Sequence, residues 1–140
     1  MSRNRASAKA AGARFERDVA AYLADVLGED RIEVRRANGR DDRGDITGVK
    51  TFRGGRVVIE CKNYTSDRIQ FQAWLAEVEA ERGNDDAHVG VLAVKPRGTT
   101  DIADAVFVMS GSTFANLIQG GFDDRPVFAE KDSTRIGVPS

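Results

Sequence analysis

The 140-residue chain carries apolar residues at helical spacing in three stretches. The first stretch runs from about residue 8 to residue 27, and Gly28 is suited to the C-terminus of that helix. The second begins near a capping residue, Ser66 or Asp67, and continues to about Arg82. These patterns predict two substantial helices with a long non-helical segment between them.

The third predicted helix is short and covers residues 111–119, with Ser112 or Thr113 near its cap. Five other stretches have the alternation or the continuous apolar run of β-strands, and they cover residues 31–37, 45–52, 56–63, 88–95 and 104–110. The order is one helix, three strands, a helix, two strands and a helix. It predicts an α/β protein with helices packed against a mixed sheet.

The length predicts one domain over residues 1–120, preceded by a flexible basic arm at 1–8. The C-terminal extension, 121–140, shows no clear periodicity beyond one candidate strand at 126–129. With 41% apolar and 31% charged residues, and no apolar run of bilayer length, the composition indicates a soluble globular protein. A lone cysteine, Cys61, excludes a disulfide framework. We therefore expect a cytoplasmic protein, bacterial or phage-encoded.

The net charge of −1 hides an uneven distribution of charge along the chain. Residues 1–62 hold 14 Lys and Arg against 10 Asp and Glu, whereas residues 63–140 hold 7 against 12. The first half is therefore basic by +4 and the second acidic by −5. Such an asymmetry allows a nucleic-acid-binding face on the first half.

The predicted hairpin of strands 45–52 and 56–63 separates apolar from charged positions. One face would carry Ile46, Phe52, Val57, Ile59 and Cys61. The other face would carry Asp45, Thr47, Val49, Val58, Glu60 and Lys62. A symmetric turn would place Asp45 opposite Lys62 and diagonal to Glu60, so that the two carboxylates could converge on one cation.

Two carboxylates and a lysine on paired strands suit metal-assisted phosphodiester hydrolysis. Mg²⁺ prefers oxygen ligands and binds through one or two carboxylates together with substrate phosphate. A neighbouring lysine can stabilise the charge that develops in the transition state. The alternative is an ordinary ion pair on a solvated face, but the preceding apolar run, "RVVI", predicts a central strand in which unpaired charge is costly.

The pattern of Asp45, fourteen residues and then Glu60-Cys61-Lys62 resembles the signature of the PD-(D/E)XK nucleases. Within that superfamily it is most similar to the archaeal-type Holliday-junction resolvases, over about residues 10–95. Gly44 stands where the signature has a proline. The resemblance implies a restriction-endonuclease-like fold, with a central mixed β-sheet flanked by helices.

The resemblance also implies roles for individual residues. Asp45 and Glu60 would ligate the metal, with the backbone carbonyl of Cys61 as a further ligand. Lys62 would be the catalytic lysine, and Glu16 would reach the metal directly or through water. Mg²⁺ would be the cofactor, with Mn²⁺ as a substitute. From the helical pattern alone, Glu16 could equally be a surface residue at the border of the apolar stripe.

Other residues complete the prediction. Candidates for DNA binding are Arg35, Arg36, Arg40, Arg43 and, by the resemblance, Gln70. Solubility would explain some of these arginines equally well. Asp41 and Asp42 could replace Asp45 as ligands, although turn formation explains them better. His88 and Trp74 read as structural residues.

The expected function is that of a Mg²⁺-dependent DNA endonuclease acting on four-way junctions or related branched DNA. A junction offers two scissile strands related by two-fold symmetry, so a single-site domain is expected to work as a homodimer. The segment 104–119 is apolar enough to contribute an interface. The alternatives are a general duplex or single-strand nuclease, a non-catalytic DNA-binding module, and a protein that binds another protein through its acidic half.

Overall fold

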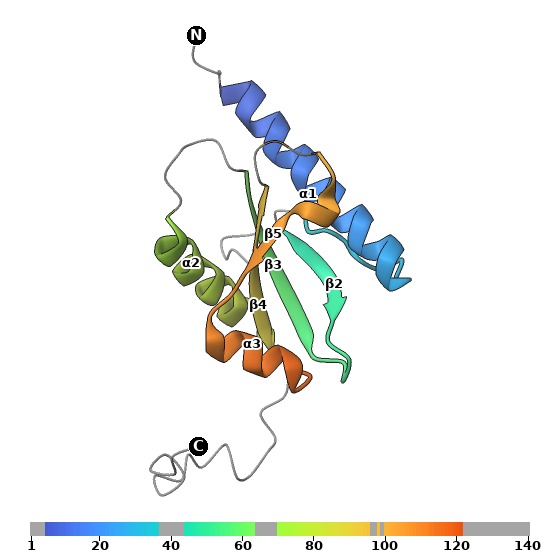
Figure 1. Ribbon diagram of the computed structural model, residues 1–140, viewed down its shortest axis with the longest axis vertical. Helices are drawn as coiled ribbons and strands as arrows, with labels where there is room; N and C mark the ends of the chain where they lie inside the picture. The colour runs from blue at the N-terminus through green and yellow to red at the C-terminus, as the bar shows by residue number, and fades with distance from the viewer. Residues whose placement is uncertain (1–4, 37–43, 64–69, 96–97, 99, 122–140) are drawn as a thin grey trace, which may run out of the picture.

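A mixed five-stranded sheet with helices packed on both of its faces forms the body of the protein (Figure 1). The computed structural model describes residues 5–36, 44–63, 70–95, 98 and 100–121. In chain order the elements are α1 (Arg5–Leu27), β1 (Glu33–Val34), β2 (Ile46–Lys50), β3 (Arg56–Asn63), α2 (Phe71–Asn84), β4 (Val89–Lys95), the 3-10 turn η1 (Ile102–Asp104), β5 (Val106–Val108) and α3 (Gly111–Ile118).

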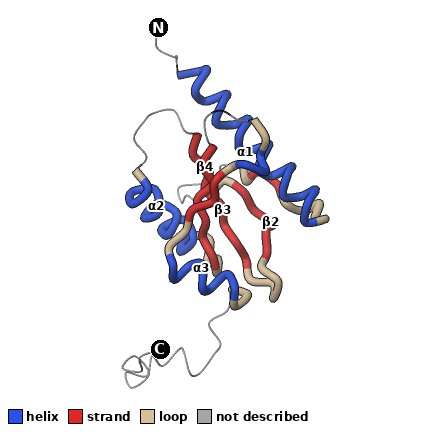
Figure 2. The backbone as a smooth tube through the Cα atoms, viewed as in Figure 1, coloured by secondary structure: helices blue, strands red, loops and turns tan. Residues whose placement is uncertain are grey.

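The strands lie in the sheet in the same order as in the chain, β1-β2-β3-β4-β5. Figure 2 shows β2, β3 and β4 side by side. The β3–β4 pair is parallel, and helix α2 connects the two strands, whereas the other three pairs are antiparallel. This arrangement confirms the predicted α/β class with a mixed sheet. It also brings the C-terminal ends of the two central strands, β3 and β4, to the same edge of the sheet.

Two apolar clusters, one on each face, bury the sheet. On β4, Val91 and Ala93 pack with Phe15 of α1, whereas Leu92 and Val94 pack with residues of α2. Because both faces of this strand are covered, it reads as a continuous apolar run instead of an alternating one. None of the described helices is long and apolar enough to cross a membrane.

The ends of several elements differ from the prediction. Helix α1 already begins at Arg5, so residues 5–8 belong to it and are not the flexible arm expected over 1–8. Helix α2 begins at Phe71, with Gln70 as its N-cap residue, and the expected capping residues, Ser66 and Asp67, lie outside the described residues. The N-cap of α3 is Ser110, whose hydroxyl accepts a hydrogen bond from the Thr113 N–H, and neither Ser112 nor Thr113 has that role.

The strands are shorter than predicted at both margins of the sheet. β1 pairs only over Glu33–Val34, within the expected 31–37, and β5 only over Val106–Val108, within the expected 104–110. Both are edge strands, for which a short length limits unwanted pairing with other chains. The candidate strand at 126–129 lies outside the described residues.

The register of the β2–β3 hairpin is also different. Ile46 pairs with Ile59 and Val49 with Val57, and a bulge lies between the two pairs. The extra residue turns Val49 onto the α1 face, where it packs against the core, although the unbroken alternation predicted the charged face. Phe52, expected on the apolar face, is fully exposed, at 104%.

Gly48 makes this bulge possible. Its φ is +92°, and a Cβ at this position would overlap the carbonyl oxygen of Arg31. We predict that Gly48→Ala lowers the free energy of unfolding by about 1–3 kcal/mol from backbone strain, and further because of the overlap. Urea denaturation measures the loss.

Gly54→Ala is the matched control for that substitution. Gly54 has a similar φ of +91°, but a Cβ there meets no atom within 4 Å. Gly54→Ala should therefore show the strain without the overlap. Equal losses in the two variants would contradict the close packing of Gly48 against the segment before β1.

Candidate active site

Asp45 lies where β2 and β3 separate. The Asp45 N–H donates to the Ile59 carbonyl at 2.9 Å, and two residues further along β3 the Cys61 N–H donates to Asp45 Oδ2 at 2.8 Å. The side chain therefore takes the place of a backbone acceptor at the end of the β2–β3 ladder. This holds the carboxylate against the C-terminal half of β3.

Gly44 allows the chain to enter β2 in this way. Its φ is +88°, and a Cβ there would overlap the side chain of Val58. Proline, whose φ is fixed near −65°, cannot adopt this conformation. The glycine that departs from the nuclease signature is therefore required by the backbone that positions Asp45.

The carboxylates of Glu16 and Glu60 converge on Asp45 from two different elements. Burial raises the pKa of Glu16, on α1, to about 7, with further contributions from the charge of Asp45 and a hydrogen bond with it. Glu60, on β3, is only 7% exposed, and its pKa rises to about 10 because of burial and then the charges of Asp45 and Glu81. The three predicted carboxylates thus form one electrostatically coupled group.

Lys62 completes the predicted set of site residues. Its Nζ lies 3.3 Å from Glu60 Oε2 and 2.5 Å from Glu77 Oε2. Burial alone would lower the pKa of this ammonium group, but the hydrogen bonds and charges of Glu77 and Glu60 outweigh it and raise the pKa. Lys62 therefore remains positively charged at neutral pH and is suited to stabilising negative charge, not to abstracting a proton.

Two further acidic residues at the site were not predicted. The carboxylate oxygens of Glu77 and Glu81, one turn apart on α2, lie within 4.8 Å of each other and of Glu60. Their positions carry a signal in the sequence, because each lies three residues after an apolar residue of the buried stripe, Trp74 and Val78. Carboxylates on the buried face of a helix are costly to bury, so their presence there indicates a functional site.

The oxygen-only donor set fits a hard divalent cation such as Mg²⁺. Glu60 Oε1 is buried and accepts no hydrogen bond within the described part of the chain. Glu60 belongs to two clusters of carboxylates, one with Glu16 and Asp45 and the other with Glu77 and Glu81. The Lys62 ammonium, which pairs with Glu60 and Glu77, already neutralises part of the charge of the second cluster. Among the described residues, the carboxylate oxygens that lie within 4.8 Å of one another are those of Glu60, Glu77 and Glu81. Glu16, Asp45 and Glu60, with the Cys61 carbonyl, stay the predicted ligands.

The ion pair between Lys62 and Glu77 gives a prediction of its own. If Glu77 anchors the lysine, Glu77→Gln should lower the rate of metal-dependent DNA cleavage about tenfold, as for other residues that orient a functional group. The Kd for DNA should stay unchanged. Single-turnover kinetics and a binding titration in EDTA separate the two quantities.

Glu79→Gln is the matched control, because Glu79 lies on the same helix, is exposed and pairs with Arg82 at 2.6 Å. It should cleave at the wild-type rate. A Glu77→Gln protein that is as active as this control would show that Lys62 needs no anchor on α2.

The structure describes three of the five predicted DNA-binding residues. Arg35 forms an ion pair with Asp85, through one terminal nitrogen, at 3.1 Å. Arg36 and Gln70 are exposed. Arg40 and Arg43 lie outside the described residues, as do the alternative ligands Asp41 and Asp42. Arg35, Arg36 and Gln70 therefore stay predicted DNA-binding residues.

The remaining residues weighed from the sequence have structural positions. Cys61 packs against the α1-side core, and burial raises the pKa of its thiol far above the usual range, so it is no nucleophile. His88 Nδ1 accepts a hydrogen bond from the Arg56 N–H at 3.1 Å. Trp74 packs on the α2-side core.

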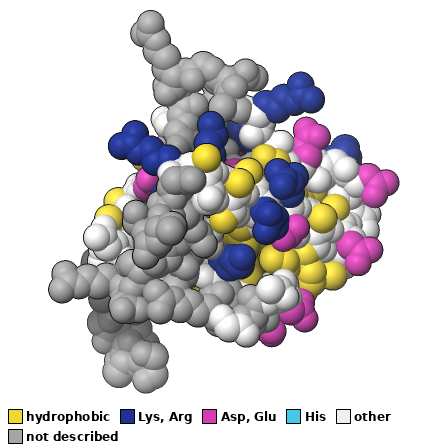
Figure 3. Space-filling model, turned by 90° about the horizontal axis from the view of Figure 1, so that it is seen from above, with side chains coloured by type: hydrophobic (Ala, Val, Ile, Leu, Met, Phe, Trp, Pro, Cys, Tyr) yellow, Lys and Arg dark blue, Asp and Glu magenta, His cyan; other side chains and the backbone are white. Residues whose placement is uncertain are grey.

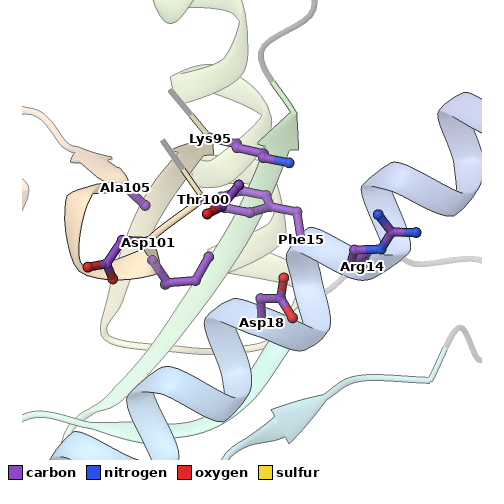
Figure 4. Close-up of a pocket in the computed structure, with 8 residues that line it drawn as sticks. Arg14, Phe15, Asp18, Lys95, Thr100, Asp101 and Ala105 are labelled. Atoms are coloured by element: carbon purple, nitrogen blue, oxygen red, sulfur yellow. The ribbon is translucent and has the colours of Figure 1, made fainter. Parts of the chain in front are cut away.

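A cavity of about 150 Å³ lies on another flank of α1, between that helix and the loop leading to η1 (Figure 4). Arg14 and Lys95 line it, but so do Asp18 and Asp101. This balance of charge does not select a phosphate. The cavity therefore adds no defined ligand site to the carboxylate group.

The chain matches no protein-family model, and searches against curated proteins and solved structures found no match.

Proposed function

We propose that the protein is a metal-dependent DNA endonuclease of the PD-(D/E)XK type that hydrolyses phosphodiester bonds in four-way junctions or related branched DNA. One observation carries the proposal: the carboxylates of Glu16, Asp45 and Glu60 meet beside the charged Lys62. Clustered carboxylates repel DNA phosphate unless a cation lies between them, so a protein that only binds DNA has no use for them.

Each residue has a chemical role in this proposal. Glu16, Asp45 and Glu60 would hold Mg²⁺, which when bound polarises the phosphoryl oxygen and activates water. The Asp45 carboxylate is fixed in place by the Cys61 N–H, so it needs little rearrangement to serve as a ligand. The Lys62 ammonium lies next to Glu60 and would stabilise the charge that develops on the scissile phosphate.

The preference for branched DNA rests on the resemblance to junction resolvases and on the need for paired sites. Apolar side chains are exposed on β5 and α3, namely Val106 at 49%, Phe114 at 54% and Ile118 at 70%. They support the proposal of a homodimer formed through the segment 104–119. Two copies related by two-fold symmetry could then cut two strands of one junction.

Cleavage of three synthetic substrates tests the function. A four-way junction, a matched linear duplex and a single strand are incubated with Mg²⁺, Mn²⁺ or EDTA and analysed on denaturing gels. We expect metal-dependent, paired nicks confined to the junction. Cleavage of all three substrates would support the proposed nuclease activity but reject the preference for junctions. No cleavage under any condition would reject the proposed nuclease activity.

A further inference from the structure

The N-terminal part of α1 extends beyond the sheet at the edge where β3 and β4 end (Figure 1). Neither apolar cluster includes a residue from the first ten positions of the helix, and the first core residue is Phe15. Arg5, Lys9 and Arg14 are exposed. This part of α1 therefore presents side chains to solvent next to the candidate site.

The charge of this segment is entirely positive. Residues 5–15 contain Arg5, Lys9 and Arg14 and no acidic residue. Within the described part of the chain none of these three cations forms an ion pair, whereas Arg31, Arg35, Arg56, Lys62 and Arg82 all do. Cations near a helix N-terminus are also disfavoured by the helix dipole, so a bound polyanion would relieve this concentration of charge.

Two of the three cations share a helix face with Glu16. Four residues separate Arg5 from Lys9 and seven separate Lys9 from Glu16, spacings that return to the same side of an α-helix. The face that directs Glu16 towards Asp45 therefore continues past the sheet through Lys9 to Arg5. The distance along the axis from Arg5 to Glu16 is about 16 Å, a length over which duplex DNA presents several phosphates.

Gly12 lies on this face between Lys9 and Glu16. A Cβ at Gly12 meets no atom within 4 Å, so the space in front of the helix is open there. A glycine inside a helix is destabilising relative to alanine, and a close approach of another backbone is one reason to keep it. Figure 3 views this end of the molecule and shows several Lys and Arg side chains on its surface.

We propose that the α1 face formed by Arg5, Lys9 and Gly12 binds the phosphate backbone of the DNA and leads the strand to the carboxylates at Glu16. The inference rests on the proposed nuclease function and names the surface that holds its substrate. It assigns DNA binding to α1, in contrast to the arginines before β2 that the sequence suggested. Arg5 and Lys9 would each neutralise a phosphate, and Gly12 would let the strand approach the helix closely.

The salt dependence of DNA binding tests this surface without any catalysis. The Kd of a labelled four-way junction is measured in EDTA over a series of NaCl concentrations. Each lost phosphate contact reduces the slope of log K against log salt by about 0.9. The double variant Arg5→Ala/Lys9→Ala should therefore lower the magnitude of the slope by about 1.8 and weaken binding at low salt.

A matched double variant, Arg31→Ala/Lys50→Ala, removes the same net charge from exposed positions outside α1. It should leave the slope nearly unchanged. Gly12→Glu should weaken binding by about tenfold or more, because its carboxylate faces the phosphates. Gly12→Ala should weaken binding less, because its methyl group only limits the close approach of the strand. Thermal melts of each variant confirm that the fold is retained.

The outcomes distinguish this surface from the nuclease proposal. Equal slopes in the two double variants, or normal DNA binding by Gly12→Glu, would overturn the α1 surface. If the wild-type protein still cleaves DNA in that case, the proposed nuclease function stands without this surface. If the wild-type protein binds no DNA even at low salt, both proposals fail. A selective loss in the α1 variants supports the surface.

Discussion

Lys62→Ala is expected to lower the rate of metal-dependent DNA cleavage by about 10²–10³-fold, the typical effect of removing one group that stabilises transition-state charge. The reason is the position of its ammonium group, 3.3 Å from a carboxylate oxygen of Glu60, together with a raised pKa that keeps it charged. Single-turnover cleavage at saturating protein measures the chemical step. The Kd for DNA in EDTA should change little, because one cation of many is removed.

Three control experiments accompany this measurement. Lys50→Ala removes an exposed lysine from the end of β2 and should cleave normally. Lys62→Arg should not restore the wild-type rate, because the planar guanidinium cannot reproduce a compact ammonium between Glu60 and Glu77. A melting curve of Lys62→Ala controls for the loss of that ion pair. Wild-type cleavage by Lys62→Ala would remove the lysine from the mechanism.

The sequence predicts the central strands well because their signal is long and local. A short unbroken apolar run is typical of a strand covered on both faces, and β4 is found at Val89–Lys95 within the expected 88–95. β3 has the expected bounds, Arg56–Asn63, because Val57, Ile59 and Cys61 alternate onto the α1-side cluster. Long periodic segments determine where Glu60 and Lys62 lie.

The pairing register between strands is less predictable from the sequence. Asp45 was expected opposite Lys62, but Ile46 pairs with Ile59, which places Asp45 two residues earlier along β3. One residue of the difference arises at the turn, where Lys50 pairs with Arg56, and one at the bulge around Gly48, whose need for positive φ depends on the neighbouring segment. The set of Asp45, Glu60 and Lys62 could therefore be predicted, but its geometry could not.

Glu77 and Glu81 illustrate a second limit. The periodicity of α2 places both residues on the buried side, yet the connection between β3 and α2 does not reveal which strand position they face. Only the packed structure brings them to Glu60 and shows that Glu77 holds Lys62. Contacts between elements that are distant in sequence depend on tertiary packing, which a single sequence pattern does not encode.

The metal-free protein is expected to lose stability as the pH rises from about 5 to 8. Glu60 has a pKa of about 10 in the folded protein against an ordinary value of 4.5, and Glu16 about 7 against 4.5. A carboxyl group whose pKa is raised by folding binds its proton more tightly in the native state. Its contribution to stability is complete below pH 4.5 and is lost progressively up to the folded pKa.

Mg²⁺ should reverse this loss, because the cation replaces the protons among the carboxylates. At a concentration one hundred times Kd, binding adds about 2.7 kcal/mol, which for a domain of this size raises Tm on the order of 5–10 °C. The increase should be larger at pH 8 than at pH 6, since fewer protons must then be displaced. Calorimetry at several pH values, with Mg²⁺ or EDTA, measures both effects.

Glu60→Gln tests the origin of these effects in one variant. The amide needs no proton and carries no charge, so the metal-free variant should melt several degrees above wild type at pH 8 and gain little from Mg²⁺. It should also lose cleavage, because a ligand is missing, so that stability and activity change in opposite directions. Glu79→Gln, an exposed change on α2, should leave melting and cleavage unaltered. If wild-type stability instead rises between pH 5 and 8, Glu60 is ionised in the folded protein, and its coupling to Asp45 is weaker than the structure implies.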